Sequence, residues 1–134
     1  MDYTVEGGLM SWAGQRTFIE ERLSDNWATT PISYSNVDYA PVANSSFIRL
    51  TVLGGDTIDA SFSTSRSSGV VVMQVFTPSN IGSATALSYA DSLAAIFEGV
   101  TSDEFVFGTA SLEVVGAVEN FFQVNVNIGF TEDG

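Results

Sequence analysis

The sequence predicts an α+β fold, in which an antiparallel β-sheet carries two α-helices packed on one face as a two-layer sandwich. Residues 11–27 and 82–98 each carry apolar side chains at helical spacing, with a single apolar stripe. Several other segments alternate apolar and polar residues with the period of two that is typical of half-buried strands. A helix with one apolar stripe buries it against another element, so both helices should cover the apolar face of the sheet.

The first helix is expected to begin at Ser11, with Trp12 packed at its start. One face collects its apolar side chains, namely Phe18, Ile19, Leu23 and Trp27. Glu21 and Asp25 fall on a solvated face, and Arg16 can reach Glu20 one turn further along.

Residues 26–44 are rich in Thr, Ser, Asn and Pro, which predicts an extended, partly stranded connection. Its expected anchors are Ile32, Tyr34, Val37 and Tyr39. Residues 47–53 alternate as a half-buried strand. The Gly54-Gly55-Asp56 sequence is a strong turn signal, after which residues 57–63 are expected to return as a strand. The polar residues 61–69 predict a mobile, projecting hairpin tip or loop.

The segment Val70–Gly99 predicts a strand followed by a helix. Residues 70–76 form an apolar, β-branched run, and Pro78 ends it because proline has no N–H for a β-ladder. Gly82 and Ser83 are expected to open the helix. Its apolar positions are Leu87, Ala90, Leu93, Ala94 and Phe97. Gly99 lies where a left-handed residue is expected to end it.

The last part of the chain predicts more strands. Residues 101–104 are expected to form a loop, and residues 105–118 one or two strands with bulges at Gly108 and Gly116. Residues 122–130 show the cleanest alternation in the chain and predict a final strand. Residues 131–134 are expected to be a short acidic tail.

Composition excludes several kinds of chemistry. The chain has no cysteine, histidine or lysine. Disulfides, thiolate or imidazole metal sites, Schiff bases and P-loop phosphate binding therefore have no residue to carry them. At 134 residues the chain has the size of one domain, expected at residues 11–134 after a flexible N-terminal arm at residues 1–10. No run of 18 apolar residues occurs, so no membrane-spanning helix is expected.

The charge is strongly negative and unevenly distributed. The formal net charge is −12, and all 4 basic residues are arginines at or before residue 66. Such a surface repels phosphate backbones, so specific binding of nucleic acid is not expected. Acidity of this kind also serves solubility alone.

The order of these elements resembles the tail terminator (tail completion) proteins of long-tailed bacteriophages. The resemblance rests on RTFIEERL, the strand leading into VFTP, the helix ending AAIFEG, and FFQVNVNIGF, and it spans residues 11–130. It implies a virion structural protein without enzymatic activity or cofactor. It also implies a homo-oligomeric ring, typically a hexamer, that is assembled in the host cytoplasm and caps the tail tube at the head–tail junction. The implied partners are the tail tube protein and a head completion or connector protein, while DNA passes through without specific binding.

Six residues are candidates for binding such partners: Arg49, Arg66, Ser65, Ser67, Asp56 and Asp59. In so acidic a chain, an arginine can pair with a carboxylate of a neighbouring subunit, although an ion pair within the chain is the commoner use. Asp56 and Asp59 could also hold a divalent cation, but turn chemistry explains Asp56 better. No catalytic and no metal-binding residues are predicted.

Two other functions stay open at this level. One is another neck, head–tail joining or minor tail protein of a phage. The other is a small enzyme or ligand-binding domain that uses carboxylates alone.

Overall fold

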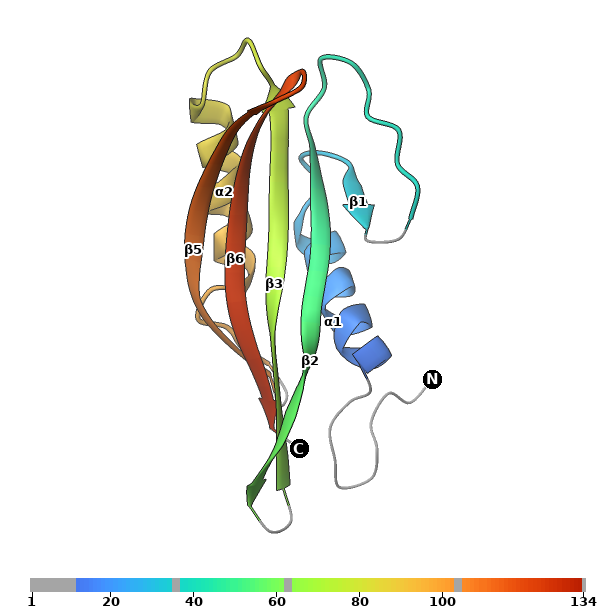
Figure 1. Cartoon of the computed structure of the whole chain (residues 1–134), viewed down its shortest axis with the longest axis vertical. Helices are drawn as coiled ribbons and strands as arrows, with labels where there is room; N and C mark the ends of the chain where they lie inside the picture. The colour runs from blue at the N-terminus through green and yellow to red at the C-terminus, as the bar shows by residue number, and fades with distance from the viewer. Residues whose placement is uncertain (1–11, 35–36, 62–63, 103–104, 134) are drawn as a thin grey trace.

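The computed structural model describes residues 12–34, 37–61, 64–102 and 105–133, and within them the chain forms two helices and one six-stranded sheet (Figure 1). The elements in chain order are α1 (Trp12–Asn26), β1 (Ile32–Tyr34), β2 (Phe47–Ser61), β3 (Thr64–Pro78), α2 (Ala84–Phe97), β4 (Thr101–Ser102), β5 (Phe105–Val118) and β6 (Phe121–Asp133). Both helices lie on the same face of the sheet, which confirms the predicted two-layer α+β sandwich (Figure 1). The predicted arm at residues 1–10 lies outside the described residues.

The sheet has the strand order β1-β2-β3-β6-β5-β4. β1 is parallel to β2, and every other neighbouring pair is antiparallel. β1 and β4 are short, so four long strands form most of the sheet, with β3 and β6 at its centre. α1 lies at the β2 side of the sheet and α2 at the β5 side (Figure 1).

The core lies between the sheet and the helices. The buried side chains of the long strands include Ile48, Leu50, Val71, Met73, Val75, Val124, Val126, Ile128 and Phe130. α1 contributes Ile19 and Leu23, and α2 contributes Leu93 and Phe97, each fully buried as predicted. Burying a side chain of this size stabilises the fold by about 1.5–3 kcal/mol, so these stripes account for the position of both helices.

The two helices are also joined to each other. Arg22 Nε donates a 2.9 Å hydrogen bond to the carbonyl oxygen of Ile96, and its guanidinium lies 5.9 Å from the centre of the Phe97 ring. Arg16 forms the predicted ion pair with Glu20, at 2.6 Å. Gly99 follows α2 with a φ of +69°, which confirms the predicted left-handed end of that helix.

The predicted turn at Gly54-Gly55-Asp56 is wrong. β2 continues through it to Ser61, and Gly54 pairs with Gly69 of β3. The register shifts between Gly54 and Asp56, so the sheet absorbs this sequence as a β-bulge rather than as a turn. Residues 61–69 lie at the end of the β2–β3 hairpin, as one of the two predicted alternatives has it, but they are strand rather than loop from Thr64 onward. Residues 62–63 lie outside the described residues.

At Gly69 of β3, the backbone of β2 and the Phe130 ring of β6 both approach closely. A Cβ atom at this position would lie 2.6 Å from the carbonyl oxygen of Leu53 and 2.6 Å from Cζ of Phe130. Phe130 is the direct cross-strand neighbour of Gly69. The buried Phe130 ring thus occupies the space that a side chain at residue 69 would need, so only glycine fits.

Four smaller expectations are also corrected. Trp12 is 66% exposed rather than packed, and Val37 is 60% exposed rather than an anchor. Thr101–Ser102 forms β4 instead of a loop. The expected acidic tail belongs to β6 up to Asp133, because β3 and β5 both extend far enough to pair with it. The bulges predicted in β5 are confirmed by register shifts between Phe107 and Ala110 and between Val114 and Gly116.

Candidate functional site

The candidate partner-binding residues fall into two places. Asp56, Asp59, Ser65, Arg66 and Ser67 all lie on the β2–β3 hairpin, where Asp59 pairs with Ser65 across the two strands. This hairpin extends beyond both helices and beyond the end of β6 (Figure 1). The register places Arg66 next to the last residue of β6, so the segment beyond it is a two-stranded projection. The sixth candidate, Arg49, lies near the start of β2.

Ser67 differs from its neighbours on the hairpin because its side chain is buried. Its hydroxyl oxygen accepts a 3.1 Å hydrogen bond from Gln15 Nε2. The same Gln15 amide donates a 2.8 Å hydrogen bond to Oε1 of Glu132, which is 1% exposed. Ser67 therefore belongs to a buried polar cluster that ties α1 to β3 and β6, whereas Arg66 beside it is exposed.

The sequence patterns did not lead us to predict the buried cluster of Gln15, Ser67 and Glu132. Two of these residues, Gln15 and Glu132, nevertheless continue the spacing of buried apolar residues in their elements. Glu132 continues the period of two that runs through the buried residues of β6, two residues after Phe130. Gln15 lies four residues before the buried Ile19, on the same helix face. Extending each apolar pattern by one step would have placed both polar side chains in the interior.

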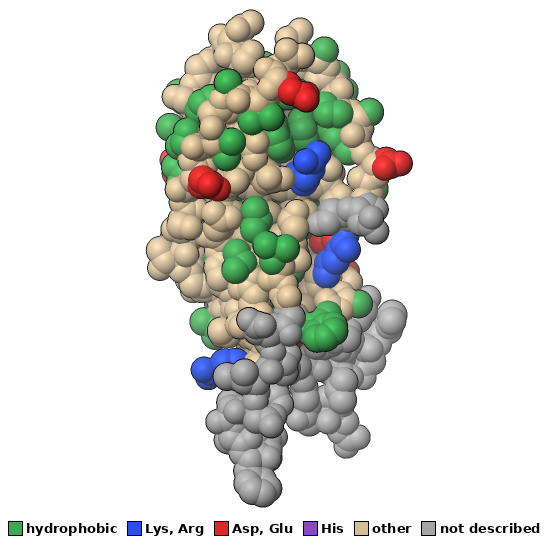
Figure 2. All heavy atoms as spheres, viewed as in Figure 1, with side chains coloured by type: hydrophobic (Ala, Val, Ile, Leu, Met, Phe, Trp, Pro, Cys, Tyr) green, Lys and Arg blue, Asp and Glu red, His purple; other side chains and the backbone are tan. Residues whose placement is uncertain are grey.

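The sheet face opposite the helices carries a row of polar side chains across four strands. The register aligns Arg49 of β2, Gln74 of β3, Asn125 of β6 and Glu113 of β5. Asn125 Nδ2 donates a 2.9 Å hydrogen bond to Glu113 Oε1. Arg49 lies 5.6 Å from the centre of the Phe76 ring. Figure 2 shows this face, where charged side chains are few among uncharged and hydrophobic ones.

The last strand places the amide side chains of Gln123, Asn125 and Asn127 on this face. Gln123 Nε2 donates a 2.9 Å hydrogen bond to Asn125 Oδ1, and Asn127 lies in register with Val72 of β3. This face is thus held together by side-chain hydrogen bonds.

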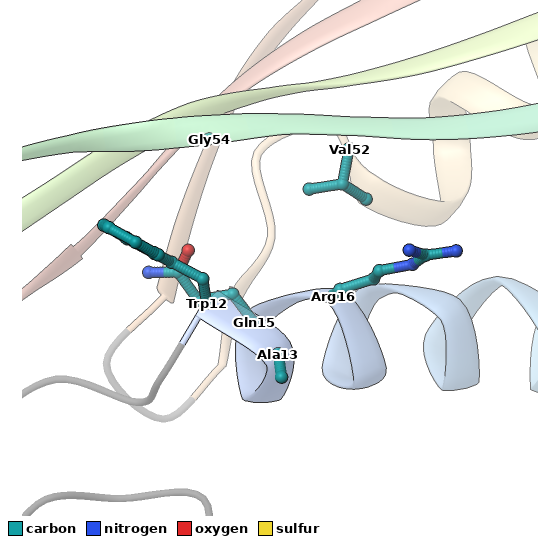
Figure 3. Close-up of a pocket in the computed structure, with 6 residues that line it drawn as sticks. All are labelled: Trp12, Ala13, Gln15, Arg16, Val52 and Gly54. Atoms are coloured by element: carbon teal, nitrogen blue, oxygen red, sulfur yellow. The ribbon is translucent and has the colours of Figure 1, made fainter. Parts of the chain in front are cut away.

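Each side of the molecule has a hollow. On the β2 side, a pocket of about 480 Å³ is lined by Trp12, Ala13, Gln15, Arg16, Val52 and Gly54. Figure 3 shows Trp12 and Arg16 projecting from α1 on the side that faces β2. On the β5 side, a pocket of about 220 Å³ lies between α2 and the sheet. Its lining includes Ala90, Asp91, Ala94, Glu98, Ala110, Ser111, Leu112 and Val126.

The β5 side also exposes apolar side chains. Leu112 and Val114 are 51% and 58% exposed, and Val115 and Val118 are also exposed. Among the described residues only Thr101–Ser102 pair with this edge of β5, at Phe105 and Val106. An edge strand with this composition is a ready surface for another protein chain.

The described residues offer little for metal chemistry. No group of three or more acidic, histidine or cysteine side chains among them could hold a metal ion. Neither described helix is long and apolar enough to cross a lipid bilayer.

The chain is similar to known proteins in sequence and in structure. Residues 16–120 match a family model that is described as phage tail terminator protein. One similar solved structure, whose title states no function, is 25% identical, with a TM-score of 0.70. The match covers 92% of this chain and 96% of that one. No curated protein sequence matches the chain.

Proposed function

Because the chain belongs to the phage tail terminator protein family, a family of virion structural proteins, we propose that it acts by assembly. In this proposal it forms a ring, with six subunits, on the end of the finished tail tube. The ring stops further addition of tube protein and provides the joint between the tail and the head. The observation that carries the proposal is the family match, which spans residues 16–120.

The two sides of the sheet support a ring. A ring of identical subunits needs a heterologous contact, in which one surface of a subunit meets a different surface of the next. The β2 side presents Trp12 and Arg16, whereas the β5 side presents Leu112 and Val114. These unlike surfaces lie at opposite sides of one sheet. Each subunit can therefore meet one neighbour with its β2 side and another neighbour with its β5 side, as a heterologous contact requires.

The β2–β3 hairpin supports contact with a second protein. It projects beyond the helices, and it carries the exposed Arg66 in a chain with a net charge of −12. An exposed arginine can form a charge-assisted, two-pronged hydrogen bond with a carboxylate of a partner. We assign the hairpin to the contact with the tube protein or with the head completion protein.

Electron microscopy of phage lysates tests the proposed function. A phage in which this gene is inactivated is expected to produce tails of uncontrolled length without heads attached. Supplying the intact gene in trans should restore tails of uniform length. Headless tails that are already uniform in length would contradict the terminator function and favour a role limited to head–tail joining.

A further inference from the structure

Trp12 is an unusual residue to leave on a surface. Its side chain is 66% exposed at the start of α1, although burial of an aromatic ring removes roughly 150–250 Å² from water. Arg16 lies one helical turn further along and projects on the same side of α1 (Figure 3). Tryptophan and arginine are the residue types that most often dominate the binding energy of protein interfaces.

The opposite side of the molecule has a pocket with matching properties. The pocket between α2 and β5 has a floor of small side chains, Ala90, Ala94 and Ala110, and an apolar wall at Leu112. Its volume of about 220 Å³ has the size of one large side chain rather than of a substrate. Because alanine leaves the pocket empty, an aromatic ring from another molecule can fill it.

The rim of this pocket is acidic. Asp91 and Glu98 are both exposed at the pocket, and Glu98 Oε2 accepts a 2.7 Å hydrogen bond from the Ala110 N–H. That hydrogen bond holds the Glu98 carboxylate between α2 and β5. The chain has no basic residue after Arg66, so in a second copy of this chain the cations that could meet this rim lie on α1, β2 and β3.

These observations identify the partner as a second copy of this chain. We propose that Trp12 of one subunit inserts into the α2–β5 pocket of the next subunit. Arg16, which forms an ion pair with Glu20 in its own subunit, is then placed against Asp91 and Glu98 as well. α1 lies at the β2 side of the sheet and the pocket at the β5 side, so one pair of subunits can make only one such contact (Figure 1). Repetition of such a head-to-tail contact produces a ring when the rotation between neighbouring subunits closes. This inference rests on the proposed function, because it names the contact that would close the proposed ring.

The alternative contact, between two β5 edges, is disfavoured by charge. Pairing this side with itself would bring Asp91, Glu98 and Glu113 of both copies together without any arginine. The carboxylates of the two copies would repel one another, and several like charges facing each other make an interface unstable.

Two single variants and their mixture test the contact. Trp12→Glu removes the ring and introduces repulsion against Asp91 and Glu98, whereas Leu112→Lys blocks the pocket and repels Arg16. Each variant alone is expected to weaken self-association at least about tenfold in sedimentation velocity and native mass spectrometry. Both replaced side chains are more than half exposed, so both variants should fold. Val42→Lys, at a side chain that is 60% exposed and lines neither pocket, is the matched control and should assemble like the parent chain.

The mixture of the two variants separates a heterologous contact from a symmetric one. The Leu112→Lys chain keeps its Trp12, and the Trp12→Glu chain keeps its pocket. Equal amounts of the two are therefore expected to form a one-to-one heterodimer that grows no further. A Trp12→Glu chain that dimerises by itself, or a mixture that stays monomeric while the parent assembles, would overturn the inference.

Tryptophan fluorescence gives a readout that does not depend on oligomer size. The chain has 2 tryptophans, and Trp27 is already buried at 6% exposure. The emission of the parent chain should therefore shift to shorter wavelength as subunits associate, because only Trp12 loses water. The Trp12→Phe variant should show no shift at any concentration. Assembly of the parent chain without a shift would overturn the inference.

Failure of this contact is distinguishable from failure of the proposed function. A parent chain that stays monomeric, or Trp12→Glu rings that match the parent's, would overturn the Trp12 contact. Neither result would alter the tail lengths seen by electron microscopy, which test the terminator function separately.

Discussion

Gln15 and Glu132 are separated by 117 residues in the sequence, yet Gln15 Nε2 donates a 2.8 Å hydrogen bond to the Glu132 carboxylate inside the protein. The same amide reaches the buried Ser67 hydroxyl. One side chain thus connects the start of α1 to the end of β6 and to the base of the projecting hairpin. Breaking a hydrogen bond to a buried charged group destabilises a protein more than breaking a neutral one.

Replacing Gln15 with leucine is expected to lower the free energy of unfolding by about 2–3 kcal/mol. The variant keeps a buried side chain of similar size but removes a donor from the Glu132 carboxylate. Urea denaturation measures the change. Glu21→Gln, at an exposed position on the same helix, is the control and should change stability by about 0.5 kcal/mol or less. Equal stability of the two variants would mean that this hydrogen bond contributes nothing.

Replacing Gly69 with alanine is expected to destabilise the sheet by about 1–3 kcal/mol. The added methyl group would overlap the Leu53 carbonyl oxygen and the Phe130 ring, each 2.6 Å away. Gly108→Ala is the control, since a Cβ atom at this position would lie at an ordinary distance of 3.6 Å from the Gly129 carbonyl oxygen. Thermal unfolding followed by circular dichroism should separate the two variants, and a similar midpoint for both would contradict the close packing at Gly69.

Replacing Arg66 with glutamate is expected to impair tail completion or head joining. Arg66 is exposed on the hairpin, so the thermal midpoint should fall by less than about 3 °C. Arg66→Lys keeps the positive charge and should retain most of the function. Phage complementation and thermal unfolding are measured on the same variants. If Arg66→Glu unfolds the isolated protein, Arg66 stabilises the fold and does not dock a partner.

Local sequence patterns are enough to predict some elements of this fold and not others. α2 was predicted well because it has a strong period and a clear end at Gly99. β6 also has a strong period, but its pairing with β3 and β5 carries it beyond the predicted end at residue 130 to Asp133. The turn predicted at Gly54-Gly55 is wrong because two glycines favour a turn only where the strand has no further pairing partner. The residues after Gly55 do have one in β3. Here β3 continues to pair with β2 as far as Ser61, and this pairing across the hairpin outweighs the turn preference of the two glycines.

The candidate binding residues, too, could be predicted from the sequence only in part. The sequence placed Arg66 and Ser67 together, but it could not separate the exposed arginine from the buried serine. That difference depends on Gln15, which only tertiary packing brings to Ser67. The exposure of Trp12 was also missed, since helical spacing places a side chain on a face but does not show what covers that face.

The protein is expected not to bind duplex DNA, although DNA would cross its ring. We predict that the sheet face bearing Gln123, Asn125 and Asn127 lines the channel, together with acids from residues 67–134. Coulomb repulsion acts within about 8–10 Å at physiological salt, so acids on the channel wall keep the duplex from adhering. A gel-shift assay at physiological ionic strength checks this, and tight binding of duplex DNA would contradict the channel assignment.

The most direct test of the central claim is the length of tail tubes that grow from purified tube protein in the presence of this chain. Electron microscopy gives the length distribution with and without the added protein. The terminator function predicts that tubes stop growing once the protein is added, with one ring of it at one end of each tube. Tubes that continue to grow at the same rate, with no ring at either end, would contradict it.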